Sequence, residues 1–415
     1  MVAFSGGLDS TTLLHALAAR ATPGLCAVHV HHGLQAVADD WAQHCADFCA
    51  DLKVPLVVVH ANIDPLDPAG PEGAARQARY DLLRAQLDDD DLLVTAHHRD
   101  DQAETVLLRL LRGSGVHGLA AMRALTPFTP GHLWRPLLAC PRVKLQHYAE
   151  AQGLRWLEDP HNADPRYARS WLRAQVLPDL RRRWPQADAS LARTAHLADE
   201  AAGLLDDLAE TDHTRLAQGA ALSVAGLLAL TVPRRHNLLH WWLRRHGFDL
   251  PAAVLLDQLD RDVLAAAADA MPLLAWPGAE VRRYRDRLFV MAPLLPAPVV
   301  VQEWCEGVAL PLSAGCGRIV ADRPPPVLLR VRPVAVGASF QPYDAPHHRS
   351  CRNLFQEAGT PPWLRTRVPL LEIDGNPACI AGIAVSREWR ELLAQSGWRP
   401  VWQHEFVGLD SPLTL

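Results

Sequence analysis

Short apolar runs alternate with longer stretches of helical period over the first hundred residues. The runs are rich in valine and leucine and lie at 2–4, 25–30, 55–60 and 92–96. Two helix faces with the matching spacing lie between runs, formed by Leu13, Leu14 and Leu17 and by Tyr80, Leu83 and Leu87. Strands that alternate with helices predict an α/β fold with a doubly wound, Rossmann-like parallel sheet.

The pattern changes twice farther along the chain. From 187 to 291 it is helical and rich in alanine and leucine, and proline-rich stretches at 293–298 and 324–326 suggest a boundary. Beyond them, a helix beginning at Asn353 precedes a hairpin that turns at Asp374-Gly375. We therefore expect an α/β domain, a helical middle domain and a small α+β C-terminal domain, at 1–185, 186–295 and 325–415.

Composition favours a water-soluble globular protein. The chain has 415 residues, of which 49% are hydrophobic and 21% charged, so it can bury a sizeable core. Its longest apolar stretch, 220–232, is shorter than the roughly 18–20 residues of a membrane span, and no secretory leader is recognisable. We expect a cytoplasmic protein with no membrane contact, and either a monomer or a homodimer.

The eight cysteines are scattered, with no CxxC pair. This spacing favours neither a disulfide framework nor a zinc ribbon. We expect reduced thiols in apolar packing.

The formal net charge of -5 conceals two basic segments. Almost all of the basic residues are arginines, and they gather at 166–193 and 330–367. Clustered arginine is typical of surfaces that bind nucleic acid.

Polar residues follow the predicted strands directly. The ligand crevice of a doubly wound sheet lies beyond the carboxyl ends of its strands. After the first run comes Ser5-Gly6-Gly7-Leu8-Asp9-Ser10, after the second come His31 and His32, and after the fourth comes the stretch from His97 to Glu104. These residues are therefore the candidates for chemistry.

The stretch from Ser5 to Ser10 has the properties of a phosphate cradle. Gly6 and Gly7 permit positive backbone dihedrals and close approach, so that successive N–H groups can point at an anion from a helix N-terminus. Ser5 and Ser10 add hydroxyl donors. The alternative is a tight strand-to-helix turn in which Asp9 or Ser10 caps the helix.

Acidic residues at 100–104 form the second constellation. Asp101 and Glu104 are three residues apart near the start of a predicted helix from Glu104 to Arg112, so they share a face and suit Mg²⁺ or an amine. An Asp-x-x-Glu capping box is the alternative. For the nearby histidines, contact with a nucleotide is favoured over a zinc site, because no cysteine or ligand spacing supports zinc.

Ordered motifs carry a family resemblance. SGGLDS resembles the signature of the PP-loop ATP pyrophosphatases, which adenylate an oxygen and release pyrophosphate. The motifs SGGLDSTTLLH, HVHHGLQ, AARQARYDLL, AHHRDDQAETVLLRLLRGSG, RPLL and EDPHNADPRYARSWLRAQVLP follow the order seen in the tRNA(Ile)-lysidine synthetase family. That resemblance implies that ATP adenylates the wobble cytidine of an isoleucine tRNA with a CAU anticodon, and that free L-lysine then displaces AMP to give lysidine.

The resemblance also implies roles for individual residues. ATP would be bound by Ser5, Gly6, Gly7, Leu8, Asp9, Ser10, His31 and His97. Mg²⁺ would be held by Asp9 and Asp101, and Asp9, Asp101 and Glu104 would be catalytic, the last two through the lysine amine. Substrate would be bound by Asp100, Arg166, Arg169 and Arg173, the arginines lying beside a turn-rich loop at 158–167. The alternatives are that Asp100 caps the helix or holds the metal, and that the arginines form a solvated basic helix after a turn.

In the C-terminal domain, phosphate contacts to the tRNA would come from Arg349, Arg352, Arg365 and Arg367. Ser170 departs from the asparagine that the family often has there.

Two other functions remain open. A PP-loop sulfur transferase acting on tRNA generally uses paired cysteines, which this chain lacks. A protein that binds ATP and tRNA without chemistry is disfavoured by the intact SGGLDS and DDQAET motifs.

Overall fold

Two units make up the chain in this computed structural model, Met1–Leu204 and Leu205–Leu415. The structure describes residues 1–31, 38–61, 70–158, 166, 168–248, 253–267, 270–297, 300–313, 315–408 and 413–415. Within those ranges, no helix is both long and apolar enough to cross a membrane.

A six-stranded sheet organises the first unit. Its strands are β1 (Val2–Ala3), β2 (Ala27–His31), β3 (Leu56–His60), β4 (Leu92–Val94), β5 (Leu125–Phe128) and β6 (Gly131–Trp134). They lie in the order β3-β2-β1-β4-β6-β5, and every pairing is parallel except that of β5 with β6. The four predicted strands and their parallel arrangement are confirmed, whereas the β5–β6 hairpin was not predicted.

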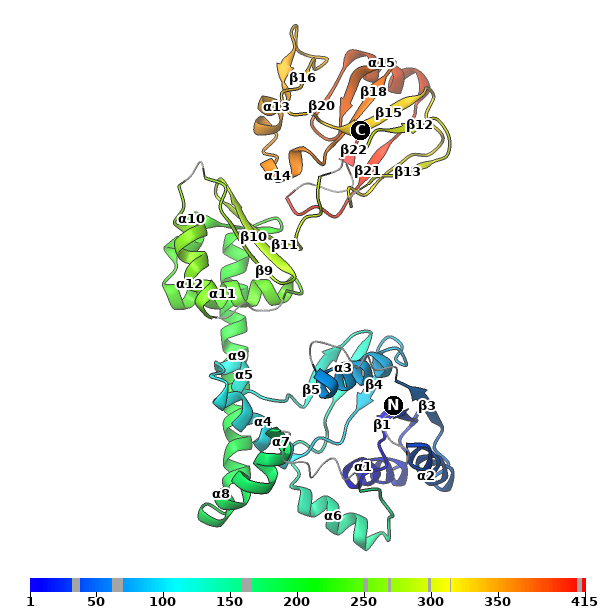
Figure 1. Cartoon of the computed structure of the whole chain (residues 1–415), viewed down its shortest axis with the longest axis vertical. Coiled ribbons are helices and arrows are strands. Elements are labelled where there is room, and N and C mark those ends of the chain that lie inside the picture. The colour runs from blue at the N-terminus through cyan, green and yellow to red at the C-terminus, as the bar shows by residue number, and fades with distance from the viewer. Residues whose placement is uncertain are drawn as a thin grey trace. The chain divides into compact units, whose positions relative to one another are not determined.

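Helices cover both faces of this sheet. The first unit contains α1 (Leu8–Ala19), α2 (Ala38–Asp51), α3 (Gly70–Arg84), α4 (Arg99–Leu111), α5 (Val116–Leu119), α6 (Arg142–Ala151), α7 (Ala168–Trp171), a π-helical segment (Leu172–Val176), α8 (Leu177–Arg183) and the first part of α9 (Ala187–Leu216) (Figure 1). Leu13 and Leu14 of α1 pack with Cys45 of α2 on one face, and Leu83 of α3 packs with Leu93 and Leu133 on the other. The doubly wound fold is therefore confirmed.

The middle of the chain contains helices and a sheet. Its helices are the end of α9, α10 (Val224–Ala229), α11 (Val232–Arg245), α12 (Ala253–Gln258) and a π-helical segment (Leu259–Leu264). The strands β7 (Ala217–Gln218), β8 (Ala221–Ser223), β9 (Leu273–Trp276), β10 (Ala279–Tyr284) and β11 (Arg287–Met291) form an antiparallel sheet in the order β7-β8-β11-β10-β9. The helical character of this region is confirmed, and the sheet is an addition that the alanine- and leucine-rich pattern did not predict.

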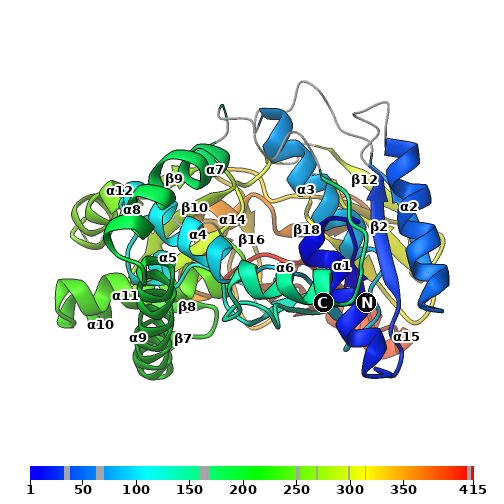
Figure 2. The same cartoon turned by 90° about the horizontal axis from the view of Figure 1, so that it is seen from below.

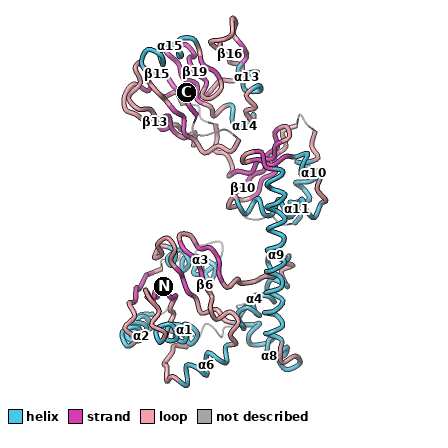
Figure 3. The backbone as a smooth tube through the Cα atoms, turned by 180° about the vertical axis from the view of Figure 1, so that it is seen from behind, coloured by secondary structure: helices cyan, strands magenta, loops and turns pink. Residues whose placement is uncertain are grey.

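The C-terminal part is rich in strands. These are β12 (Gln302–Trp304), β13 (Ala309–Pro311), β14 (Arg318–Val320), β15 (Leu329–Pro333), β16 (Ser339–Phe340), β17 (Arg349–Ser350), β18 (Pro369–Ile373), β19 (Asn376–Ile380), β20 (Ala384–Val385), β21 (Val401–Gln403) and β22 (Leu413–Thr414) (Figure 3, magenta). The helices are α13 (Cys351–Glu357), α14 (Pro362–Arg365) and α15 (Arg387–Ser396). Strands β12 to β14 lie between the two proline-rich stretches, yet β12 pairs with β15, and β14 pairs with both β13 and β21.

The predicted hairpin at Asp374-Gly375 is confirmed. It joins β18 to β19, and both turn residues have positive φ, 47° and 81°. Two successive positive φ angles are those of a type I′ turn, for which Asp-Gly is a favoured pair. The predicted helix in this part begins at Cys351, two residues earlier than expected.

No disulfide joins the eight cysteines, all of which lie in described parts of the chain. Five are buried, which agrees with the expected apolar packing, but Cys305 is exposed and contradicts it.

Candidate active site

The loop from Ser5 to Ser10 leads from β1 into α1, as predicted. Gly6 has a φ of +77°, and a Cβ built there would lie 2.8 Å from Cδ1 of Leu157 and 3.1 Å from Sγ of Cys45. Gly7 has an ordinary φ of -76°, so the expectation of a positive dihedral is wrong at that position. It is the N-cap of α1, and no side chain caps the helix there. The first N–H groups of α1 are therefore open to a bound anion.

Hydroxyl groups hold the loop in shape. The Ser5 and Ser10 Oγ atoms are 3.1 Å apart, and Ser10 Oγ donates to the Gly7 carbonyl at 3.1 Å. Thr11 Oγ1 donates to the Gly6 carbonyl at 3.2 Å. The side chain of Leu8 is buried, so only its backbone can face a ligand.

Asp9 lies close to two basic side chains from other elements. Its Oδ2 is 3.5 Å from Nε2 of His98, and its Oδ1 is 3.6 Å from Nε of Arg142 at the start of α6. Oδ1 is buried and has no hydrogen-bond partner among the described residues. A carboxylate oxygen left in that state suits a cation.

The helix after β4 begins earlier than expected. α4 starts at Arg99 and not at Glu104, because His98 is its N-cap. The His98 N–H donates to Oδ2 of Asp101 at 3.0 Å, and the Asp101 N–H donates to Nδ1 of His98 at 3.4 Å. The capping box is therefore formed by His98 and Asp101. The sequence had suggested Asp101 and Glu104, one turn later.

His98 lies among three carboxylates. It is 1% exposed, and burial by itself would lower its pKa. A hydrogen bond to Asp9 and the charges of Asp101, Asp9 and Asp100 outweigh burial, so the net pKa is raised. His98 thus connects the loop of β1–α1 with the start of α4.

Glu104 is fully buried and paired with an arginine from a distant part of the chain. Arg173 Nε donates to Oε1 of Glu104 at 2.7 Å and Nη2 donates to Oε2 at 3.0 Å, while Nη2 is also 3.4 Å from Oδ1 of Asp101. Burial raises the pKa of Glu104 despite the opposing effect of Arg173. Arg173 lies in the π-helical segment that follows α7, and Figures 1 and 2 show α7 beside α4 in both views.

Asp100 fills a structural position. It accepts a hydrogen bond from the N–H of Arg142, the first residue of α6, at 2.9 Å, and one from Nη2 of Arg181 at 2.9 Å. Arg181 also pairs with Asp188 of α9. The Asp100 side chain therefore caps α6 and ties α4 to α8.

Two of the three predicted tRNA-binding arginines contact residues of this site. Arg169 Nη2 donates to Oγ1 of Thr105 at 3.2 Å, and Arg173 contacts Asp101 and Glu104. Arg166 is exposed. Residues 159–165 and Tyr167, which make up most of the expected anticodon loop, lie outside the described residues.

The two histidines assigned to the nucleotide lie in different surroundings. His31 is 3.0 Å from Asp39 and its ring centroid is 4.8 Å from that of His60. His97 Nδ1 is 2.9 Å from the Thr95 hydroxyl, and burial together with Arg135, Arg76 and Arg79 lowers its pKa to about 3. His32 lies outside the described residues, and no group of three metal-ligating side chains occurs in the part that is described.

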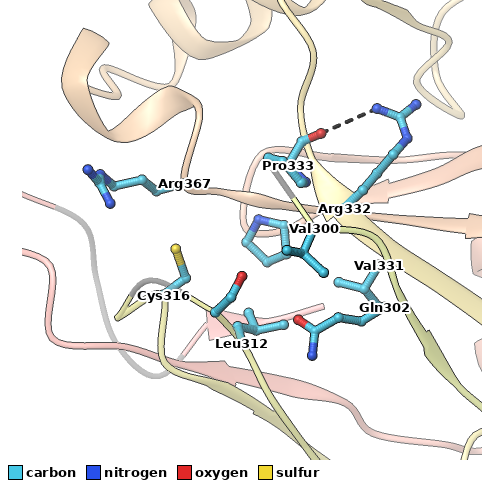
Figure 4. A pocket seen from close by; sticks show the side chains of 10 residues that line it. Val300, Gln302, Leu312, Cys316, Val331, Arg332, Pro333 and Arg367 are labelled. Atoms are coloured by element: carbon cyan, nitrogen blue, oxygen red, sulfur yellow. Dashed lines mark hydrogen bonds between the residues drawn. The ribbon is translucent and has the colours of Figure 1, made fainter. Parts of the chain in front are cut away.

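The arginines expected to meet tRNA in the C-terminal part are mostly engaged in the fold. Arg367 is buried and donates to the Leu295 carbonyl, Arg365 donates to the Thr360 carbonyl at 3.0 Å, and Arg349 pairs with Glu357. Arg367 also lines a small pocket (Figure 4). Arg352 is the one of the four that is exposed and makes no hydrogen bond or ion pair with another described residue.

Sequence reasoning missed several cationic residues at this site, among them Arg142, Arg181, Arg79 and Arg135. Two lie in quoted motifs, since Arg79 belongs to AARQARYDLL and Arg135 to RPLL. Arg135 directly follows β6, so the rule that led to His97 after β4 would have found it once β6 was recognised.

Family models match the chain in three successive places. A PP-loop domain matches residues 1–180, the TilS substrate binding domain matches 222–289, and the TilS substrate C-terminal domain matches 329–402. A solved U34-tRNA thiolase from Methanococcus maripaludis is 21% identical with a TM-score of 0.41, over 48% of this chain and 70% of its own.

Three proteins that resemble this chain over most of its length are all described as tRNA(Ile)-lysidine synthases. The tRNA(Ile)-lysidine synthase of Alkalilimnicola ehrlichii is 42% identical, covering 96% of this chain and 92% of the relative. That of Serratia proteamaculans is 40% identical, covering 97% and 95%, and that of Methylococcus capsulatus is 41% identical, covering 92% and 90%. With such similarity over nearly all of both chains, and with the PP-loop built as described, this chain belongs to the tRNA(Ile)-lysidine synthase family.

Proposed function

We propose that this protein is a carbon–nitrogen ligase that joins lysine to C2 of the wobble cytidine of the isoleucine tRNA with a CAU anticodon. ATP adenylates the cytosine carbonyl oxygen with release of pyrophosphate, and the lysine amine then attacks C2 and expels AMP. The lysidine produced changes the codon read from AUG to AUA and the amino acid accepted from methionine to isoleucine. One observation carries this proposal: relatives named tRNA(Ile)-lysidine synthase match the chain nearly end to end.

The loop Ser5–Ser10 is proposed to bind the phosphates of ATP. The uncapped N-terminus of α1 offers backbone N–H groups and a positive dipole end. The hydroxyls of Ser5 and Ser10 lie in the same turn and can exchange their mutual contact for one with phosphate oxygen. His31 is proposed to contact the nucleotide from the neighbouring strand end, and His97 would do so as a neutral ring.

Mg²⁺ is proposed to bind at Asp9. Its buried Oδ1 has no hydrogen-bond partner among described residues, which fits a cation. Asp101 is a second candidate, but its two oxygens already accept hydrogen bonds from His98 and Arg173. When bound, Mg²⁺ would offset the charge of the phosphates and of the leaving pyrophosphate.

Asp101 and Glu104 are proposed to receive the lysine amine. An ammonium must lose a proton before it can attack, and a carboxylate with a raised pKa is a better proton acceptor than an ordinary one. Burial raises the pKa of Glu104, and Arg173 holds both of its oxygens in place. Arg173 would thus act on the substrate through Glu104, whereas Arg166 and Arg169 are proposed to contact the anticodon phosphates.

The direct test measures transfer of labelled lysine to tRNA. Purified protein, ATP and Mg²⁺ are incubated with an isoleucine tRNA transcript carrying CAU and, separately, with a wobble-uridine control. Label should be retained on the cytidine transcript alone and only with ATP. Glu104→Gln should abolish retention, whereas Glu150→Gln on the exposed side of α6 should not.

Release of AMP and pyrophosphate without lysine on the tRNA would contradict the proposed substrate but would still agree with the ATP chemistry of a PP-loop enzyme. If neither product forms with competent tRNA, the protein binds its ligands without catalysis. The cytoplasmic location remains part of this proposal.

A further inference from the structure

Arg142 brings a third element of the fold to Asp9. It is the first residue of α6, and its Nε lies 3.6 Å from Oδ1 of Asp9. Its backbone N–H donates to Oδ1 of Asp100 at 2.9 Å, and Asp100 also accepts a hydrogen bond from Arg181 of α8. The side chain of Arg142 therefore starts from a fixed point beside the loop Ser5–Ser10.

Helices α1 and α6 lie side by side (Figures 1 and 2). Thr12 Oγ1 donates to the Leu145 carbonyl at 3.4 Å, and one turn later His15 Nδ1 is 3.0 Å from the Tyr148 hydroxyl. The contact of α6 with the aspartate of the loop lies one turn earlier on both helices, so all three contacts belong to one register of parallel helices. This packing holds the start of α6 at the loop.

The pairing of Asp9 with Arg142 is of a kind that can be exchanged. The distance of 3.6 Å is too long for a hydrogen bond, and the two side chains are 32% and 46% exposed. Oδ1 of Asp9 is buried and accepts no hydrogen bond from a described residue. By contrast, Arg173 holds the buried Glu104 through two short hydrogen bonds. A partly exposed ion pair without hydrogen bonds contributes little free energy, so a stronger cation can displace it.

A guanidinium and a divalent metal ion compete for the same carboxylate oxygen. Oδ1 of Asp9, the oxygen that fits a metal ion, is also the oxygen near which Arg142 lies. Arg142 keeps its charge at every pH at which proteins are folded, so it cannot yield by losing a proton. Phosphate oxygens are strong acceptors for guanidinium N–H groups. A phosphate chain on the loop would therefore offer Arg142 another partner.

We propose that Arg142 pairs with Asp9 in the free enzyme and leaves it for the phosphates of ATP, so that metal and nucleotide binding are coupled; this inference rests on the proposed function. Without phosphate, Arg142 opposes a metal ion at Asp9. With phosphate, Arg142 has turned to the nucleotide and opposes the metal ion no longer. By linkage, the metal ion strengthens nucleotide binding by the same factor as the nucleotide strengthens metal binding.

Two binding constants of the full chain test the proposal through effects of opposite sign. Mn²⁺, which takes the same oxygen ligands as Mg²⁺, is titrated into nucleotide-free protein, and the free ion is measured by electron paramagnetic resonance. Arg142→Met should bind Mn²⁺ roughly 2- to 5-fold more tightly than wild type, as expected from the loss of a partly exposed ion pair. Labelled ATP is then dialysed against metal-free protein. The same variant should bind it roughly 10- to 100-fold more weakly, as expected from the loss of a hydrogen bond to a charged group.

Two controls assign the effect to Asp9. Lys144→Met removes a positive charge from an exposed position on the same helix and should leave both constants near wild type. In the Asp9→Asn background, Arg142→Met should no longer tighten Mn²⁺ binding, because the carboxylate for which the two cations compete is gone.

An Arg142→Met protein that binds Mn²⁺ no more tightly than wild type overturns the inference, and so does unchanged binding of ATP. A gain in Mn²⁺ binding that persists with Asp9→Asn overturns it as well. Damage to the fold would weaken the binding of both ligands, and in that event Arg142→Gln decides the matter by the same two constants. None of these measurements needs tRNA or lysine, so their outcome is distinct from a failure of the proposed function, in which wild type transfers no lysine to tRNA.

Discussion

Replacing Gly6 by alanine should destabilise the first unit far more than the same change at Gly7. At Gly6 the φ of +77° costs an alanine roughly 1–2 kcal/mol. Its Cβ would also meet Cδ1 of Leu157 at 2.8 Å and Sγ of Cys45 at 3.1 Å. Overpacking of this kind costs about 1–3 kcal/mol, so the expected total is about 2–5 kcal/mol.

Two other glycines separate the contributions. Gly113 has a φ of +69° with nothing within 4 Å of its Cβ position, so Gly113→Ala isolates the backbone cost of roughly 1–2 kcal/mol. Gly7 has an ordinary φ, and the nearest atom to its Cβ position is Ser5 Oγ at 3.6 Å. At Gly7, alanine is a poorer N-cap residue than glycine, but it also lowers the conformational entropy of the unfolded chain. These two effects oppose each other, so the net change in the free energy of unfolding should stay within about 1 kcal/mol.

Hydrogen–deuterium exchange of backbone amides in α1 is the appropriate assay, because it reports the first unit separately from the rest of the chain. The free energy of opening should fall in the order wild type, Gly7→Ala, Gly113→Ala, Gly6→Ala. If Gly6→Ala costs no more than Gly113→Ala, the contacts with Leu157 and Cys45 do not constrain the loop. A loss at Gly7 as large as that at Gly6 would refute the backbone argument altogether.

Three further predictions follow from single residues. The pKa of His97 is lowered to about 3 in the folded chain, against an ordinary 6.5. The stability that His97 contributes is therefore complete above about pH 6.5 and is lost as the pH falls towards 3. His97→Asn should reduce this loss, as measured by hydrogen–deuterium exchange across the acidic range. Cys305 is the one exposed cysteine of the eight, all of them described, so a thiol reagent should show one fast phase that Cys305→Ser removes, whereas fast modification of Cys45 would contradict its burial. Arg352→Gln should weaken tRNA binding in filter-binding assays and reduce the slope of the logarithm of the binding constant against the logarithm of salt concentration by about 1. Arg367→Gln, at a buried position, should instead lower the stability that denaturation measures.

The parts of the fold that the sequence predicts well are those with local causes. Strands β1 to β4 coincide with short apolar runs in a parallel sheet, although β3 lies at its edge and exposes Val57 and Val58. Helices α1 and α3 show their buried faces in their spacing. The strands β12 to β14 were not predicted, because each has only three residues and because β12 and β14 pair with strands from later in the chain, β15 and β21, while β13 pairs with β14. Such short runs carry too few residues to show a period.

The start of α4 illustrates a local signal that was read incorrectly. Serine, threonine, aspartate and asparagine are the usual N-cap residues, so Asp101 was the natural candidate. His98 caps the helix instead, since its Nδ1 accepts the Asp101 N–H while the Asp101 carboxylate accepts the His98 N–H. Because α4 begins at Arg99, Asp101 lies in its first turn and Glu104 lies farther along the helix, at a fully buried position.

The pairing of Glu104 with Arg173 shows what sequence motifs leave out. Each residue was selected from its own motif, one for the lysine amine and the other for RNA, yet the two are 69 residues apart and share a bidentate hydrogen bond. A buried carboxylate without a partner would be protonated or would destabilise the fold, so the position of Glu104 requires a cation nearby. Glu104 thus depends on Arg173 for its charge and its orientation, and both motifs must be present for either to form the site.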